Sequence, residues 1–198
     1  MALKFLSIVT TPKVAAAQRD YYGRAQALPE PPATDPLGED EQRFINARDS
    51  FYLATVSESG WPYLQHRGGP AGFLHVLSPH QLGFADYRGN RQMLSTGNLA
   101  TNDKVALFLM DYPRRERLKI LGHARVLDAR SHPELKAQLA PPALAGKVER
   151  LFLIDVVGFD WNCSQHITPR YTASEVEALV APLRAQIREL TSGAPPAA

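Results

Sequence analysis

Arginine and short polar side chains are concentrated in one segment, Phe84-Ala-Asp-Tyr-Arg-Gly-Asn-Arg-Gln92. The sequence predicts the end of a β-strand here, then a tight loop, and then a helix over residues 91–101. Arginine forms forked, charge-assisted hydrogen bonds with phosphate oxygens, so Arg88 and Arg91 are candidate phosphate ligands. The exposed N–H groups and the dipole at a helix N-terminus also favour an anion. The pattern therefore indicates a phosphate site.

Three neighbouring polar side chains, Asn90, Gln92 and Ser95, can add hydrogen bonds, and Gly89 lets the backbone approach a ligand closely. Neither GxGxxG nor GxxxxGK[ST] occurs in the chain, so the loop differs from the common nucleotide-binding loops. Taken alone, the segment is equally compatible with a solvated turn that carries two surface arginines. The segments on either side favour the phosphate site.

Short apolar runs at near-regular spacing predict an antiparallel β-protein around this loop. Residues 51–67 form a predicted hairpin, with residues 57–60 as its turn. Further strands are predicted at residues 73–77, 81–85, 104–110, 118–127 and 151–157. Closely spaced strands with a single inserted helix are typical of a closed or partly closed barrel.

The order and spacing of several motifs resemble the FMN-binding split-barrel proteins related to pyridoxamine 5′-phosphate oxidase. The resemblance covers residues 42–171 and rests on six segments: 51–57 with 60–62, 65–70, 86–92, 98–109, 118–125 and 161–170. It implies a mainly β fold, an antiparallel, Greek-key-like split β-barrel with peripheral helices.

The resemblance also implies FMN as the cofactor. The phosphate would lie on the loop around Arg88 and Arg91, and the isoalloxazine along the strand that contains His66. In such proteins the flavin lies at a dimer interface, which implies a homodimer whose two chains share each site. Trp161 and Arg170 occupy positions similar to a tryptophan and an arginine near the oxidase C-terminus. The cofactor-binding residues so predicted are Gln65, His66, Arg67, Arg88, Asn90, Arg91, Gln92, Ser95, Trp161 and Arg170.

Two segments depart from the oxidase pattern. Residues 65–70, Gln-His-Arg-Gly-Gly-Pro, stand where the oxidase has an arginine–lysine phosphate pattern. Cys163-Ser-Gln-His166 stands where the oxidase has its C-terminal signature for the substrate phosphate. The sequence therefore predicts the flavin but not a vitamin B6 substrate.

The predicted function is an FMN-dependent oxidoreductase that transfers hydride or electrons between the flavin and a small molecule, with reduced nicotinamide or oxygen as the other reactant. No acid or base is assigned, although His66 and His166 are the best candidates because histidine titrates near neutral pH. Each is equally a hydrogen-bonding support for the flavin. Two alternatives stay open: a non-enzymatic flavin-binding redox sensor or store, and a haem-handling split barrel. The haem alternative needs an axial ligand from among His66, His75, His123 and His166.

The amino-acid composition favours a single-domain protein and gives no indication of nucleic-acid, metal or membrane binding. The 198 residues are 44% hydrophobic, enough for one domain with a sizeable core, and the net charge of +2 does not indicate nucleic-acid binding. The single cysteine, Cys163, excludes an internal disulfide and suits the reducing cytoplasm. The histidines lack metal-ligand spacing, and no apolar run approaches the roughly 20 residues that span a bilayer. The sequence thus predicts a cytoplasmic protein without a metal or membrane site.

The two ends differ from the central domain, which is predicted at residues 39–171. Residues 1–38 form an N-terminal arm in which residues 13–27 favour helix and residues 28–38 form a proline-rich linker. A further helix is expected over residues 38–48, with acidic residues in its first turn. Thr172 and Glu175 form a predicted capping box for an amphipathic C-terminal helix. Its apolar stripe is expected to pack on the barrel or on a second subunit, before a disordered tail at residues 192–198.

Overall fold

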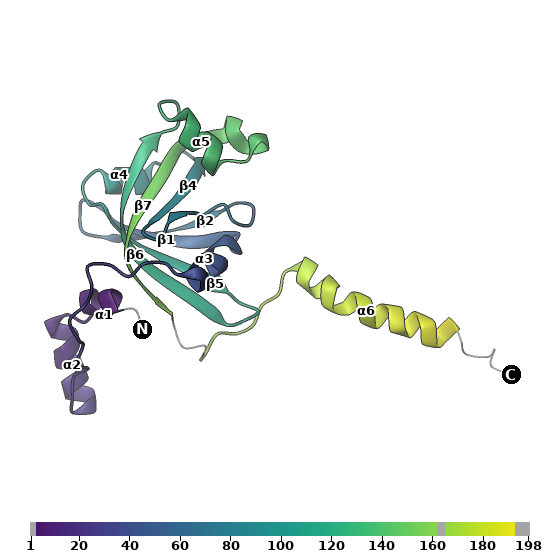
Figure 1. Ribbon diagram of the computed structural model, residues 1–198, viewed down its shortest axis with the longest axis horizontal. Helices are drawn as coiled ribbons and strands as arrows, with labels where there is room; N and C mark the ends of the chain where they lie inside the picture. Colours follow the sequence, from purple (N-terminus) through teal and green to yellow (C-terminus); the bar gives the residue numbers. More distant parts are fainter. Residues whose placement is uncertain (1–2, 162–164, 193–198) are drawn as a thin grey trace.

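The computed structural model describes residues 3–161 and 165–192, whose seven strands form one antiparallel sheet with the order β2-β1-β5-β6-β7-β4-β3 (Figure 1). The strands are β1 (Ser50–Val56), β2 (Pro62–Gly68), β3 (His75–Ser78), β4 (Gln81–Tyr87), β5 (Lys104–Asp111), β6 (Glu116–Asp128) and β7 (Val148–Trp161). The helices are α1 (Leu3–Val9), α2 (Pro12–Tyr22), α3 (Glu39–Asn46), α4 (Leu94–Leu99), α5 (Pro133–Leu139), the 3₁₀-helix η1 (Pro142–Lys147) and α6 (Ala173–Ser192). The predicted mainly β fold with peripheral helices is confirmed.

Alternating side chains direct one face of β1, β2 and β5 to the interior. Along β5, Val105, Leu107 and Leu109 are buried while the residues between them are more exposed. The predicted hairpin is also present, since β1 pairs with β2 from Ser50↔Gly68 to Val56↔Pro62. Every predicted strand exists, and β6 and β7 are longer than expected from their apolar runs.

The sheet curls until its two ends approach each other. Arg67 on β2 and Asp86 on β4 form an ion pair of 2.5 Å, although β2 and β4 occupy the first and sixth places in the strand order. Inside the curl, the rings of Phe51 on β1 and Phe84 on β4 pack edge to face with centroids 5.4 Å apart. These contacts close the sheet into a barrel around a phenylalanine- and leucine-rich core.

The end of the proline-rich linker belongs to that core. Leu37 is 1% exposed, and its N–H donates to the carbonyl of Pro79 at 2.8 Å. The following helix, α3, buries Phe44 and Ile45 in the same cluster. Residues 28–38 form neither helix nor strand, and their last residues dock on the barrel.

A second, smaller core lies between the sheet and two short helices that the sequence did not predict, α5 and η1. Leu139 of α5 is fully buried there against Leu151 and Leu153 of β7. With seven and six residues, each beginning at a proline, these helices carry too few turns for a visible 3.6-residue period.

The N-terminal arm is attached to the barrel through α1. The carboxylate of Asp35 accepts the backbone N–H groups of Lys4 at 3.1 Å and Phe5 at 2.9 Å. Gly158 on β7 allows this approach, because a Cβ there would lie 2.7 Å from the backbone nitrogen of Phe5. The next helix, α2, ends at Gly23 in the left-handed conformation, earlier than the predicted end at residue 27.

At the other end, α6 extends away from the barrel (Figure 1). The predicted capping box is present: the Thr172 N–H donates to Glu175 Oε2 at 2.7 Å, and the Glu175 N–H donates to Thr172 Oγ1 at 3.3 Å. Leu179 and Ile187 of its apolar stripe are 61% and 59% exposed. Ser192 is the last residue of α6, so the tail predicted from that position falls at residues 193–198, outside the described part of the chain.

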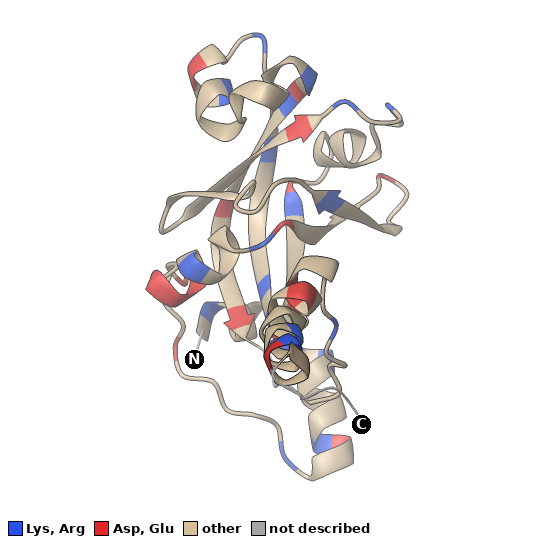
Figure 2. Cartoon of the chain, turned by 90° about the vertical axis from the view of Figure 1, so that its right-hand side faces the viewer, with Lys and Arg blue, Asp and Glu red and all other residues tan. Residues whose placement is uncertain are grey.

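Positive and negative side chains are interspersed over the barrel and helices (Figure 2). This distribution agrees with the small net charge of +2. Among the helices described, none has both the length and the apolar character required to cross a bilayer.

Candidate functional site

A polar pocket of about 260 Å³ lies at the seam where β2 approaches the end of β4. Its third wall is the loop from residue 89 to the start of α4. Six of the ten predicted cofactor-binding residues line it: Gln65, Arg67, Asn90, Arg91, Gln92 and Ser95. Four other lining residues, Tyr63, Asp86, Tyr87 and Arg150, were not singled out from the sequence.

The alternation of β2 decides which of its side chains reach the pocket. Tyr63, Gln65 and Arg67 are partly buried and line it. His66 is among the more exposed residues of the strand, and its ring packs edge-on against Tyr52 with centroids 5.6 Å apart. His66 therefore does not line this pocket, but it lines a smaller cavity of about 160 Å³ together with Arg67, Asp86 and Tyr87.

A buried carboxylate holds two guanidinium groups against the pocket wall. Asp86 is 6% exposed and accepts from Arg67 Nη1 at 2.5 Å and from Arg150 Nε at 2.8 Å. Burial lowers the pKa of Arg67, and the neighbouring Asp86 carboxylate opposes that shift. Two cations on one anion leave an excess positive charge, which a bound anion would compensate.

Two buried polar atoms, Arg67 Nε and Tyr87 Oη, have no hydrogen-bond partner within residues 3–161 and 165–192. Their residues line this pocket and also a smaller cavity of about 160 Å³. Leaving such atoms unpaired costs free energy in a folded protein, and exceptions mark sites where a ligand or water completes the bonding. Burial raises the pKa of Tyr87, so its hydroxyl stays protonated and is able to donate. The pocket therefore offers donors and positive charge, which fits a phosphate group.

The loop at the pocket is held in a strained conformation. Arg91 and Met93 have φ angles of 59° and 60°, in the left-handed region that non-glycine residues rarely occupy. Within the loop, Asn90 Nδ2 donates to Gln92 Oε1 at 3.1 Å, and the Gln92 N–H donates to Asn90 Oδ1 at 3.2 Å. Ser95 Oγ ties α4 to β2 by donating to Gln65 Oε1 at 2.8 Å.

The helix after this loop is shorter than predicted. It begins at Leu94 instead of residue 91 and ends at Leu99, because Met93 in the left-handed conformation stops the helix from extending toward the N-terminus. With six residues it has little dipole to offer an anion. The positive character of the site comes from its arginines.

Glu149 lies beside these arginines and was not predicted. Its Oε1 accepts from Arg88 Nε at 3.1 Å and from Arg91 Nη2 at 3.2 Å. Its Oε2 accepts from Arg150 Nη1 at 3.3 Å. Glu149 follows Arg88 by 61 residues, so no local spacing in the sequence indicated the contact.

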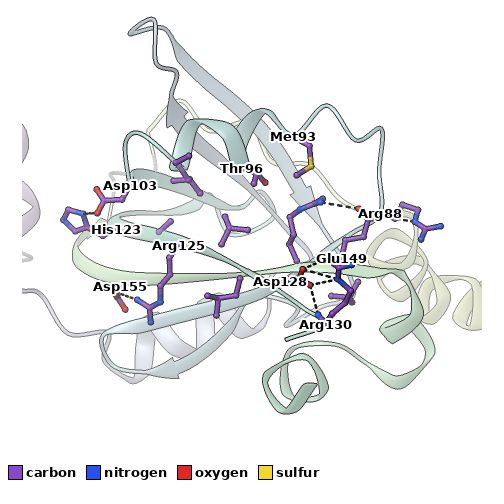
Figure 3. Close-up of a pocket in the computed structure, with 17 residues that line it drawn as sticks. Arg88, Met93, Thr96, Asp103, His123, Arg125, Asp128, Arg130, Glu149 and Asp155 are labelled. Atoms are coloured by element: carbon purple, nitrogen blue, oxygen red, sulfur yellow. Dashed lines mark hydrogen bonds and ion pairs between the residues drawn. The ribbon is translucent and has the colours of Figure 1, made fainter. Parts of the chain in front are cut away.

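Arg88 faces a larger groove, of about 1130 Å³, rather than the pocket (Figure 3). The groove adjoins the pocket, since Met93, Thr96 and Arg150 line both. Along the groove the charged side chains pair with each other, as in Arg125–Asp155 at 2.6 Å and Arg130–Asp128 at 2.6 Å.

Trp161 and Arg170 lie outside the pocket of their own chain. Trp161 Nε1 donates to Glu41 Oε1 at 2.6 Å, and its ring packs on Phe44 of α3 at a centroid distance of 4.8 Å. Arg170 lies over the ring of Tyr112 at 5.0 Å. Their approach to a flavin stays a prediction that requires a second subunit. Cys163 lies outside the described residues.

A metal centre is not indicated by the part of the chain described. Within residues 3–161 and 165–192, no group of three or more histidine, cysteine, aspartate or glutamate side chains could hold a metal ion. On the groove rim, His123 Nδ1 lies 3.0 Å from Asp103 Oδ2.

The sequence also matches a known protein family. Residues 37–145, more than half of the 198-residue chain, match the model of the pyridoxamine 5′-phosphate oxidase family. The chain belongs to the pyridoxamine 5′-phosphate oxidase-related family. The matched region contains α3, strands β1 to β6 and the polar loop of the pocket. No curated protein sequence matches this family member at a significant level.

Several solved structures are similar to this chain at low sequence identity. A variant of HupZ from Group A Streptococcus has a TM-score of 0.50 at 15% identity, over 64% of this chain and 99% of that chain. A putative pyridoxamine 5′-phosphate oxidase from Lactobacillus delbrueckii has a TM-score of 0.49 at 23% identity, over 64% and 95%. HutZ from Vibrio cholerae, described as a haem storage protein, has a TM-score of 0.47 at 18% identity, over 63% and 94%. At 15% identity, the likeness to HupZ shows the fold alone.

Proposed function

We propose that the seam pocket binds the phosphate end of FMN and that the protein is an FMN-dependent oxidoreductase acting on a small molecule. The observation that carries the proposal is the pair of buried, unpartnered donors, Arg67 Nε and Tyr87 Oη, in a pocket whose wall has excess positive charge. Membership of the family supports a flavin as the ligand.

The charges around the pocket suit a phosphate monoester. Four arginines, Arg67, Arg88, Arg91 and Arg150, are joined by ion pairs to only two carboxylates, Asp86 and Glu149. Four positive and two negative charges leave an excess of two. A phosphate monoester carries about −1.5 to −2 at neutral pH, so it would neutralise the cluster.

The pocket has room for the phosphate end of the cofactor, and the rest of FMN would extend along β2. FMN supplies hydride and electron transfer when bound, and the chain binds, orients and shields it. Gln65 is held in place for this task by Ser95. No described residue is assigned here as an acid or base.

We further propose a homodimer that completes the flavin site. The outer face of β1, β5 and β6 carries an apolar hollow of about 510 Å³, lined in part by Tyr52, Leu64 and Phe108. Leu64 on β2, one of the residues that line this hollow, is 62% exposed. An apolar surface of this kind favours burial against a second copy.

Identifying the cofactor of the purified protein tests the proposal most directly. The purified protein is expected to show a flavin absorbance spectrum and to release FMN, identified by mass spectrometry. Released FAD, a haem spectrum, or no binding when FMN is added in excess would overturn the proposal.

A second measurement separates an enzyme from a flavin store. Steady-state consumption of reduced nicotinamide, with oxygen and a range of organic acceptors, is expected to exceed that of free FMN. FMN binding without such turnover would support the non-enzymatic redox sensor or store instead.

A further inference from the structure

Glu149 occupies an irregular position in the sheet. Asp86 on β4 pairs with Arg150, but the next residue, Tyr87, pairs with Val148, so Glu149 is the extra residue of a β-bulge. Bulges re-aim side chains and are common beside functional sites. This bulge directs Glu149 toward the arginines of the polar loop, where Arg88 and Arg91 both donate to its Oε1.

The loop and the bulge are held together by the backbone as well. The Arg88 N–H donates to the carbonyl of Lys147 at 2.8 Å, and the Ala129 N–H donates to the carbonyl of Glu149 at 3.3 Å. The first bond places Arg88 beside the start of β7 without any help from the Glu149 side chain, and the second ties the bulge to the residue that follows β6. The Glu149 carboxylate is therefore not needed to bring the loop to the sheet.

The carboxylate holds its arginines as an anion. Desolvation opposes ionisation of Glu149, but hydrogen bonds from Arg88 and Arg91, together with the charges of Arg91 and Arg150, lower the pKa of this carboxyl. A ligand phosphate that binds the guanidinium groups of Arg88 and Arg91 is repelled by the negative charge of the Glu149 carboxylate. Glu149 also lines the 1130 Å³ groove, where its side chain lies beside that of Arg88 (Figure 3).

We propose that Glu149 is a built-in counter-ion that competes with the ligand phosphate for Arg91 in the pocket wall and for Arg88, which shares Glu149 Oε1 with Arg91 from the adjoining groove. It lowers the affinity of the anion site and selects for a phosphate monoester, because a dianion gains more than a single carboxylate from the two arginines. Because its affinity is lowered, bound FMN can dissociate and exchange with FMN in solution. This inference rests on the proposed FMN site.

The test compares Glu149→Gln with the wild type in titrations of the apoprotein with FMN and with riboflavin, which lacks the phosphate. The glutamine keeps the size of the side chain and removes its charge. FMN is expected to bind about three- to tenfold more tightly, the size of one to two exposed ion pairs. Riboflavin affinity is expected to stay within about twofold, because the neutral ligand makes no contact with the freed charge.

Glu116→Gln is the matched control. Glu116 is an exposed glutamate at the first position of β6, whereas the last residue of that strand, Asp128, pairs with Arg150 beside Glu149. The substitution of Glu116 therefore makes the same change in net charge at the end of β6 that lies away from the pocket. It is expected to leave FMN affinity unchanged within error. If FMN affinity in Glu149→Gln equals or falls below the wild-type value, Glu149 orients the arginines instead, and the inference is overturned.

Inorganic phosphate separates this inference from the proposed function. If neither protein binds FMN, the proposed function fails, and the counter-ion role is judged from the rise in melting temperature with phosphate. A larger rise in Glu149→Gln than in the wild type and Glu116→Gln supports the role, and an equal or smaller rise overturns it.

Discussion

Arg67 on β2 and Asp86 on β4 form a buried ion pair, 2.5 Å from Nη1 to Oδ1, between strands that stand far apart in the sheet order. Their side chains are only 13% and 8% exposed. The same contact closes the barrel and forms one wall of the candidate phosphate pocket. Barrel closure and the site therefore depend on each other.

The first prediction concerns this ion pair. Asp86→Asn leaves two poorly exposed guanidinium groups, those of Arg67 and Arg150, facing each other without their shared carboxylate. Because a buried charge that loses its partner is strongly destabilising, the free energy of unfolding should fall by about 3–5 kcal/mol. Urea denaturation measures the change.

The control for that substitution is Asp40→Asn. Asp40 pairs with Arg43 on the surface, and its side chain is 78% exposed. Its loss should cost less than about 1 kcal/mol. Equal costs for the two substitutions would show that the Asp86 pair does not stabilise the barrel.

The second prediction concerns the loop arginines. Arg88→Ala combined with Arg91→Ala should weaken FMN binding far more than riboflavin binding, because only FMN has a phosphate for them to bind. Each lost contact should cost at most about 1.5–3 kcal/mol, with the lower end favoured by the exposure of both side chains. Fluorescence titration of the two flavins into the apoprotein gives the ratio.

A double substitution on α6, Arg184→Ala with Arg188→Ala, removes the same charge at a distance from the pocket and should not discriminate between the flavins. Equal losses of FMN and riboflavin affinity in the loop variant would assign Arg88 and Arg91 a structural role.

The third prediction is a shared site in a twofold-symmetric homodimer. A chain with Arg88→Ala and Arg91→Ala is mixed with a chain carrying Trp161→Ala and Arg170→Ala. If both residue sets meet across the interface, each mixed dimer has one intact site, and FMN binding is partly restored. A monomer that holds FMN at full occupancy would contradict the shared site.

The Trp161 substitution needs its own control, because the indole also supports α3 through Glu41 and Phe44. Trp161→Phe keeps the aromatic packing and removes only the N–H donor. It should retain more stability than Trp161→Ala in urea denaturation. Absence of restored binding in verified mixed dimers would place Trp161 and Arg170 outside the partner's site.

The fourth prediction concerns pH. Burial lowers the pKa of His75 below its ordinary value of 6.5, and a backbone hydrogen bond involving Leu139 only partly opposes this. Below pH 6.5 the unfolded chain therefore binds more protons at this position than the folded one, so the free energy of unfolding decreases as the pH falls. The contribution of neutral His75 is complete above pH 6.5.

His75→Gln should make the free energy of unfolding less dependent on pH between about 7 and 5, as measured by urea denaturation at several pH values. Ser78→Ala, on the same strand, changes no ionisable group and should keep the wild-type slope. An unchanged slope in His75→Gln would show that another group causes the acid sensitivity.

Local patterns in the sequence determined most of the elements. The alternation of apolar residues along β1 and β5 predicts strands because successive side chains point to opposite faces. The arginines and amides of residues 88–92 predict a phosphate loop because their chemistry lies within one short segment. The family also follows from the order of such motifs, as the match over residues 37–145 confirms.

Only the tertiary structure decided which side chains meet at the pocket. Closure of the sheet brings Arg67 to Asp86, and the bulged register of β4 on β7 brings Glu149 to Arg88. The left-handed Met93 moves the start of α4, which helix propensity could not reveal. Barrel closure and register depend on packing between distant segments, whereas periodicity and motif spacing record only what each segment does by itself.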